Sequence, residues 1–402
     1  MSVLRRIATR GALRTRSATY ESVSDAVVGA AAASTGERVT VDAAMSLAAV
    51  WSAITLLSET IGSLPLMVYR RGAGTGGGRV RAWGDPSYRL LHDRPNAVHT
   101  PTDLKSLAVA HLLTHGNAYW GKVFEQGRVV ELWPIRPDRV RVQLVDRRPT
   151  YHVRNPSGQM SLLGAGDVVH FKGFGFGGVT GLAPLEYSRN VVGGALKRQE
   201  TQDRLSANRS IPSGFLTTDD SLTDEQKREM ARQIESKWRG ARNAGRIPIL
   251  DQGMRFVSVS LPPDQAQYVE MMRFSVQEVA RIFRVPPEMI GGDSGSSLTY
   301  STAETSSIKF LTYSVRPWLV RIEETLAADA DLFPSGTVFP EFLADALLRT
   351  ETRARTESYA VATGKRPWMH PSEVRDRENL APDDTFDSLP LPGAPLVEVT
   401  QQ

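Results

Sequence analysis

The sequence predicts an α+β protein, and three observations support this class. The 402 residues are 41% hydrophobic and 23% charged, which is enough apolar material for a sizeable core. Between residues 118 and 171, short alternating runs are separated by turn residues such as Gln126-Gly127, as in strands joined by hairpins. Residues 265–285 instead carry apolar side chains at alternating spacings of three and four, the period of one helical face. The length suggests two or three domains.

Composition excludes several classes of function. The chain has no cysteine, so disulfides, thiolate catalysis and zinc–thiolate sites are excluded. The formal net charge is only +4, from 48 basic and 44 acidic residues, which is too weak to diagnose nucleic-acid binding. No apolar run reaches the roughly 18 to 20 residues needed to span a bilayer. We therefore expect no membrane partner.

The first half of the chain is expected to form one compact domain after an N-terminal arm. Residues 1–40 are Arg-rich and then Ala/Gly/Ser-rich, which favours a flexible basic arm over a mitochondrial transit peptide. The elements expected after the arm are a helix over 41–61, a strand over 64–69, a helix over 102–114, and strands over 118–124, 129–133, 140–145, 150–153 and 168–171.

The second half is expected to be mainly helical. A long helix should start near Pro184 and run to about residue 205, followed by a small insert with strands at 215–216, 247–250 and 255–260 around a helix over 223–238 capped by Thr223. The helix over 265–285 ends at Pro286-Pro287. After a polar loop, Ser301 and Glu304 form a capping box that opens a helix kinked at Pro317, and further helices are expected over 341–363 and 371–379.

Four strings look catalytic, and each lacks a required partner. Gly173-x-Gly175-x-x-Gly178 resembles a dinucleotide fingerprint, but no second parallel strand brings an acid for the ribose. The string 292–295 echoes a serine-protease loop without an evident histidine partner. His111 and His115 could share a metal, although core or exposed histidines are the better interpretation.

The fourth string, 116–123, matches a phosphate-binding loop until Val123, which has no hydroxyl to hold magnesium. A nucleotide-dependent enzyme built on this string is the alternative interpretation. We predict a protein without catalytic residues, metal or cofactor, and therefore not an enzyme.

Several stretches together resemble one family. They are Trp51-Ser52-Ala53-Ile54, Leu64-Pro65-Leu66, Arg94-Pro95-Asn96, Gly116-Asn117-Ala118-Tyr119, Leu132-Trp133-Pro134-Ile135, Gly181-Leu182-Ala183-Pro184, Phe283-Arg284-Val285-Pro286-Pro287, Leu298-Thr299-Tyr300-Ser301 and Arg316-Pro317-Trp318. In this order they closely resemble the portal proteins of tailed bacteriophages, in the siphophage (HK-type) branch. The chain departs from the pattern at Thr302 and Ser372, where the family often has asparagine, and at Gly177-Gly178.

The resemblance implies a phage portal fold that assembles as a ring. Its expected parts are a basic arm (1–40), an α+β wing (41–181), a stem helix (182–210), a small α/β clip (211–261), a second stem helix (262–287), a tunnel loop (288–302), a kinked wing helix (303–335), and a helical crown with the C-terminal tail (336–402).

The resemblance also implies a function in the virion. The ring, a dodecamer in this family, would sit at one capsid vertex as the head–tail connector for packaging and ejection of double-stranded DNA. Expected partners are the terminase large subunit, the major capsid or scaffold protein and a head–tail adaptor, with assembly in the host bacterial cytoplasm and the gene in a phage, a prophage or a gene-transfer particle. Another minor capsid or head-completion protein is a second alternative.

Candidate site residues follow from these expected parts. For the tunnel loop facing DNA they are Asp293, Ser294, Ser296, Ser297, Thr299 and Tyr300. For the channel side of the second stem helix they are Arg273, Gln277, Arg281 and Arg284. For terminase docking on the clip they are Lys227, Arg228, Arg232, Arg239 and Arg242.

Overall fold

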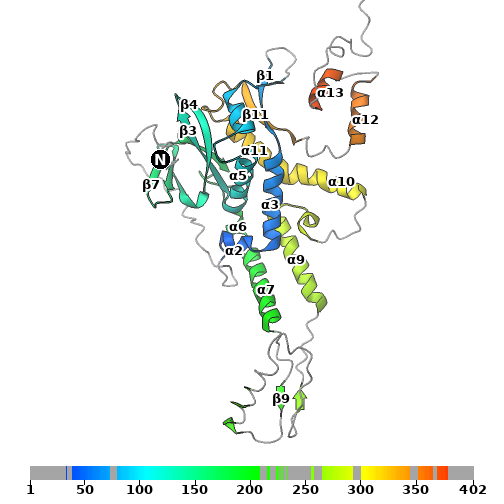
Figure 1. The fold of residues 1–402 in the computed structure, drawn as a ribbon. Coiled ribbons are helices and arrows are strands. Elements are labelled where there is room, and N and C mark those ends of the chain that lie inside the picture. Colours follow the sequence, from blue (N-terminus) through cyan, green and yellow to red (C-terminus); the bar gives the residue numbers. More distant parts are fainter. Residues whose placement is uncertain are drawn as a thin grey trace, which may run out of the picture.

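The first strand after the arm lies at the centre of a three-stranded sheet. The structure is a computed structural model that describes residues 33, 39–72, 79–208, 215–217, 223–225, 228, 229, 232, 255–257, 265–292, 300–344, 352–364 and 369–378. β1 (Leu66–Arg71) lies between β11 (Val338–Phe342) and β2 (Arg79–Arg81) and is antiparallel to both. All three strands belong to a body from which two long helices extend (Figure 1).

The helix expected over 341–363 is wrong at its start. Val338, Pro340 and Phe342 are buried while the residues between them are half-buried, and this period of two belongs to a strand. Phe342 lies opposite Leu66. The segment forms a strand because it pairs with β1, which lies far away in the sequence. The described helical parts that follow are α12 (Thr352–Ala362) and α13 (Pro371–Arg377).

The N-terminal helix is two helices rather than one. α2 (Val41–Met45) is capped by the Thr40 hydroxyl, which accepts a hydrogen bond from the Ala43 amide at 3.0 Å. α3 (Ala48–Ser63) starts after Leu47, whose backbone is extended and whose side chain is buried in the core. α3 then buries Val50, Ile54, Leu57 and Ile61 at the spacing that the sequence predicts.

A short helical segment and α5 complete the helices of the body's first half. α4 (Pro86–Tyr88) continues into a π-helical turn, η2 (Arg89–Asp93). α5 (Pro101–His115) begins with a reciprocal capping box between Thr100 and Asp103. It ends at Gly116, whose φ of 71° is the left-handed conformation that glycine tolerates best.

Two further three-stranded sheets follow α5. One has the order β4-β3-β8, with β3 (Asn117–Glu125), β4 (Arg128–Ile135) and β8 (Val168–Lys172). The other has the order β5-β6-β7, with β5 (Val140–Val145), β6 (Arg148–Arg154) and β7 (Met160–Leu163). The 3-10 turns η3 (Pro137–Arg139) and η4 (Ala165–Asp167) link them. β7 was missed from the sequence because Met160 and Leu162 are exposed, so its apolar pattern does not mark a core face.

The first long helix is also divided in two. α6 (Pro184–Tyr187) ends at Ser188, whose hydroxyl donates a hydrogen bond to the Pro184 carbonyl, and α7 (Arg189–Asn208) follows. α7 and α9 (Gln265–Phe283) lie side by side (Figure 1). The chain leads away from the body along α7 and returns to it along α9, so the two helices are antiparallel. Beyond them β9 (Phe215–Thr217) pairs antiparallel with β10 (Arg255–Val257). The strand expected at 247–250 lies outside the described residues.

The kinked helix is built from three segments. α10 (Tyr300–Lys309) leads into a π-helical stretch, η7 (Phe310–Val315), and then α11 (Arg316–Ala327). Pro317 lies in the first turn of α11. In a regular α-helix its ring would clash with the carbonyl group four residues earlier, and the wider π-helical turn of η7 makes room for it. The Ser301–Glu304 capping box is wrong, because the helix already begins at Tyr300 and both residues lie inside it.

Candidate functional site

Three of the four channel-side candidates lie on one stripe of α9, and Arg284 follows the last residue of the helix. Arg273, Arg281 and Arg284 are exposed and Gln277 is half-buried, whereas Val279 and Phe283 on the other side of the helix are buried in the main core. The spacing of four residues places Arg273, Gln277 and Arg281 along one helical face. Arg281 forms an ion pair with Glu278 one turn away, which partly offsets the positive charge of the stripe. The stripe is therefore polar and only moderately basic.

α9 is fixed to α7 by a polar contact near its middle. The Arg198 Nε donates a hydrogen bond of 2.9 Å to the Ser275 hydroxyl, and Ser275 is buried. Nearer the body, Val192 of α7 and Val279 of α9 are buried in the same core cluster. The two helices therefore share a packed interface at the body and polar contact farther out.

The turn after α9 connects this pair to the kinked helix. Arg284 has a φ of 56°, an uncommon conformation for a residue with a side chain, and it stops α9. Its carbonyl accepts a hydrogen bond from Ser314 of η7, which is buried. The turn η6 (Pro287–Ile290) follows, and its Glu288 accepts a hydrogen bond from Ser306 of α10 at 2.5 Å. Two side-chain contacts thus join the end of α9 to the kinked helix.

Most tunnel-loop candidates fall outside the described residues. Asp293, Ser294, Ser296, Ser297 and Thr299 all do, whereas Tyr300 is the first residue of α10. The flanks of the segment are described. Gly291 ends η6 with a φ of 83°, and α10 extends away from the body on the other side (Figure 1). Residues 293–299 therefore connect two elements that the Glu288–Ser306 contact holds together.

The insert candidates are partly described. Arg228 and Arg232 are helical and exposed, and Arg232 forms an ion pair with Glu229 at 3.3 Å. Lys227, Arg239 and Arg242 lie outside the described residues. An exposed pair at this spacing contributes little stability, so these charges remain accessible to a partner.

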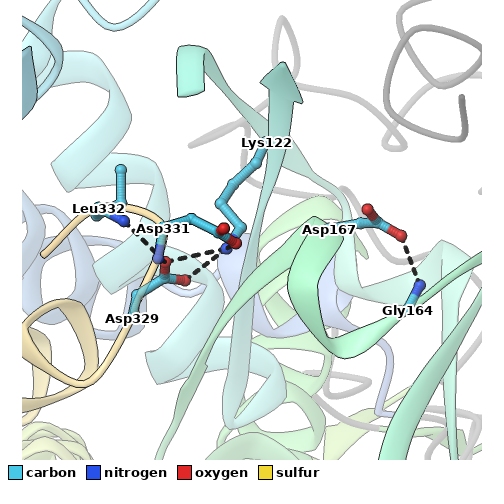
Figure 2. A network of polar contacts seen from close by, with 6 residues as sticks. All are labelled: Lys122, Gly164, Asp167, Asp329, Asp331 and Leu332. Atoms are coloured by element: carbon cyan, nitrogen blue, oxygen red, sulfur yellow. Dashed lines mark hydrogen bonds and ion pairs between the residues drawn. The ribbon is translucent and has the colours of Figure 1, made fainter. Parts of the chain in front are cut away.

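Lys122 of the phosphate-loop-like string has a different environment from a nucleotide-binding lysine. The string forms the start of β3, and the Lys122 side chain is only 1% exposed. Its ammonium group lies 2.8 Å from Asp329 and 2.9 Å from Asp331, in the turn after α11 (Figure 2). Asp329 also accepts hydrogen bonds from the backbone amides of Asp331 and Leu332. This lysine therefore ties β3 to the α11 turn, and the nucleotide-enzyme alternative loses its central residue.

Figure 2 also shows that Asp167 serves a neighbouring turn. Its carboxylate accepts a hydrogen bond from the Gly164 amide at 2.8 Å and so caps η4. The bond lies beside the Lys122 cluster without joining it. The acids around Lys122 are thus supplied by the segment after α11.

Gly173, the first glycine of the dinucleotide-like string, belongs to a tight crossing of backbones. The Gly173 amide donates to the Gly116 carbonyl at 2.8 Å, so the end of α5 meets the end of β8. Asn117 fixes the third segment, because its side-chain oxygen accepts from the Gly181 amide at 2.8 Å. A Cβ atom added at Gly181 would lie 2.3 Å from the Gly116 carbonyl oxygen. Glycine is required here for close approach between parts of one chain.

The histidines 111 and 170 lie in the body, each beside another ring. His170 stacks against Tyr119 with ring centroids 4.5 Å apart, and its Nε2 is 3.0 Å from the Asn117 side-chain oxygen. Burial lowers the pKa of His170 to about 3. Burial and the adjacent His115 lower the pKa of His111 to about 4. Both imidazoles are therefore neutral at physiological pH.

These two histidines are expected to make the fold sensitive to acid. In the unfolded chain each binds a proton near pH 6.5, whereas in the folded chain it does so only near pH 3 to 4. The unfolded state therefore binds more protons below pH 6.5, and the free energy of unfolding falls as pH falls, by about 1.4 kcal/mol per pH unit for each histidine. Urea unfolding followed by tryptophan fluorescence between about pH 7 and 4.5 measures this slope. His170→Gln should reduce this slope by about 1.4 kcal/mol per pH unit, the effect of one proton. An unchanged slope would contradict the conclusion that His170 is neutral in the folded protein.

Sequence reasoning missed two groups of residues that the structure brings together. One is the Asp329–Asp331 partner of Lys122, which follows the lysine by more than 200 positions and carries no local signal. The other is a set of arginines on β1 and β2, Arg71, Arg79 and Arg81, around the Gly-rich 72–78. Their spacing in the sequence was a usable signal, because strands on both sides of a short glycine loop pair as a hairpin.

Known proteins share both the sequence pattern and the fold of this chain. The family model described as "Phage portal protein" matches residues 48–379. The "Probable portal protein" of Streptomyces phage phiC31 is 32% identical over 377 residues, covering 88% of this chain and 79% of that protein. The "Portal protein" of Enterobacteria phage HK97 is 27% identical over 344 residues, covering 84% and 80%.

Solved structures support the same fold. A chain of the native gene transfer agent virion superposes with a TM-score of 0.61 at 23% identity, covering 87% of this chain and 95% of that one. An HK97-family phage portal protein from Corynebacterium diphtheriae superposes with a TM-score of 0.55 at 20% identity, covering 78% and 98%. The nucleotide-enzyme alternative gains no support from any of these matches. The family match, which spans the body, the paired helices and the kinked helix, shows that this chain belongs to the phage portal protein family.

Proposed function

We propose that the chain is the subunit of a portal ring, through which double-stranded DNA enters and leaves a capsid at one vertex. The observation that carries this proposal is the family match over residues 48–379, on a fold whose paired helices α7 and α9 extend from a compact body. The neck of a gene transfer agent particle, computed with C12 symmetry, contains a chain of similar fold with a TM-score of 0.58. Twelve subunits are therefore the expected number.

Within the ring, α7 and α9 would form the stem and residues 211–261 the clip. The exposed stripe of α9 would face the channel, where its ion-paired and neutral side chains can meet phosphates without a continuous cationic lining. Each added phosphate contact raises affinity, so a strongly basic lining would slow a moving DNA. Residues 293–299, rich in glycine and serine, would reach into the channel as the tunnel loop.

The clip would dock the terminase large subunit during packaging and a head–tail adaptor afterwards, while the body would contact the capsid or scaffold protein. Arg228 and Arg232 are exposed, which leaves them available for such docking. We propose no catalytic activity, because Lys122 is committed to two aspartates. ATP hydrolysis would belong to the terminase. Among the described residues, no helix has the length and apolarity to cross a membrane.

Imaging and mass measurement of the purified protein test this proposal. Negative-stain microscopy should show closed rings with a central opening, and native mass spectrometry should give about twelve times 44.2 kDa. A protein that stays monomeric or dimeric at high concentration, and that turns over Mg-ATP, would support an enzyme and contradict the portal.

A further inference from the structure

The hairpin of β1 and β2 carries an unusual set of charges. Arg70 and Arg71 end β1, and Arg79 and Arg81 lie in the three-residue β2. In the antiparallel register Tyr69 lies opposite Arg81, and Arg71 lies opposite Arg79. Because side chains alternate between the faces of a sheet, Arg71, Arg79 and Arg81 share the face of Tyr69. We call these three residues the arginine face.

Each member of the arginine face lies over an aromatic ring. The guanidinium carbon of Arg79 is 4.7 Å from the ring centroid of Tyr69, that of Arg71 is 5.7 Å from Phe339, and that of Arg81 is 5.6 Å from Trp83. Tyr69 and Phe339 themselves lie 6.1 Å apart on neighbouring strands. A guanidinium that rests on a ring is held in orientation and still has N–H donors in its plane for an anion.

The arrangement costs folding energy. Like charges directly opposite each other on antiparallel strands are destabilising, and Arg71 and Arg79 form such a pair. Glu341 of β11 offsets part of the cost through its ion pair with Arg79, in which the arginine side chain stays 50% exposed. Arg71 and Arg79 together carry more positive charge than Glu341 offsets. An anionic ligand would remove the repulsion.

We propose that the arginine face binds the phosphates of double-stranded DNA. The inference rests on the proposed portal function, which brings DNA to the protein. Figure 1 places β1 and β11 at the end of the body remote from β9, so this contact would lie outside the stem, where DNA leaves or enters the channel on the body side. Tyr69 is buried and covered by Arg79, and Arg81 lies over the ring of Trp83, which is 61% exposed, so a ligand meets a guanidinium beside each of these rings. Charge is therefore the main attraction, as in sequence-independent binding to the DNA backbone.

The test compares two triple variants of the full chain in which the same amount of charge is removed. Arg71→Gln/Arg79→Gln/Arg81→Gln removes the arginine face. Arg128→Gln/Arg148→Gln/Arg154→Gln removes three exposed arginines of β4 and β6. Fluorescence anisotropy with a labelled duplex of about 30 base pairs, at roughly 50 to 200 mM KCl, gives the slope of log K against log salt. The first variant should reduce the slope by about 0.9 for each phosphate that the protein no longer neutralises, so by about 2 to 3, and weaken binding at least about tenfold at low salt.

Two further results bear on the ligand. Glu341→Gln should tighten DNA binding, because it removes the carboxylate that pairs with Arg79. An unlabelled duplex should compete more strongly than a poly-glutamate peptide of equal charge, although both should lose affinity in the first variant because both are attracted by its charge. Equal weakening of DNA binding in the two triple variants, or a poly-glutamate peptide that competes as strongly as the duplex, would overturn the assignment to DNA. Negative-stain images of the same samples distinguish failure of the DNA site on the arginine face from failure of the portal proposal. Rings with unchanged DNA binding reject the arginine face alone, whereas absence of rings in the parent chain rejects the portal proposal.

Discussion

Replacing Lys122 with alanine is expected to lower the free energy of unfolding by about 3 to 5 kcal/mol, because it leaves two carboxylates without their cation. Asp329 has only 10% of its side chain exposed and Asp331 has 28%, so water can compensate only in part. Urea unfolding followed by tryptophan fluorescence measures the change, and Trp120 on the same strand is buried beside Phe171 as a reporter.

A neutral replacement of the whole cluster is the matched control. Lys122→Met/Asp329→Asn/Asp331→Asn keeps the volume similar and leaves a side-chain oxygen at position 329 for the amides that Asp329 now binds. Removing both signs of charge costs less than stranding one of them, so this variant should recover much of the stability. A Lys122→Ala protein within about 1 kcal/mol of the parent would show that the ion pairs contribute little.

Replacing Gly181 or Gly116 with alanine should cost about 4 kcal/mol or more, or abolish folding. The new Cβ at Gly116 would lie 2.0 Å from the Leu182 carbonyl oxygen, and the φ of 71° adds strain. At Gly181 the obstacles are the Gly116 oxygen at 2.3 Å and the Gly173 nitrogen at 2.7 Å. All these atoms belong to the backbone, so relief requires three segments to separate. The yield of soluble protein and its urea midpoint measure the effect.

Two other glycines separate crowding from backbone strain. Gly127 has a φ of 80° with open space around it, so alanine there should cost only about 1 to 2 kcal/mol. Gly84 has open space and no positive φ, so alanine should be close to neutral. If Gly181→Ala were no worse than Gly127→Ala, the crossing would be looser than the distances imply.

Locally encoded features were the ones that the sequence predicted well. The buried face of α9 follows from a period that each turn of the helix repeats. The polar stripe of Arg273, Gln277 and Arg281 follows from the same period on the opposite side of the helix. The family resemblance then supplied an interpretation of the stripe that no single motif could carry.

Features that depend on distant partners could not be predicted. β11 looked helical because its strand character depends on pairing with β1, about 270 positions earlier in the sequence. Gly173 and Gly116 of the backbone crossing with Gly181 each fell in a nucleotide-binding pattern, because close approach requires glycine whether the neighbour is a phosphate or a backbone. The structural role of Lys122 likewise could not be predicted, because its partners Asp329 and Asp331 lie in the turn after α11.

The orientation of α9 in an assembled ring tests the central claim most directly. A cryo-electron microscopy map of the purified protein, at a resolution that shows side chains, places Arg273, Gln277 and Arg281 relative to the central axis. We predict a closed ring in which this stripe faces the opening and residues 293–299 project into it above α9. A ring in which the stripe faces outward or packs against a neighbouring subunit, or a particle without a central opening, would contradict the proposed portal.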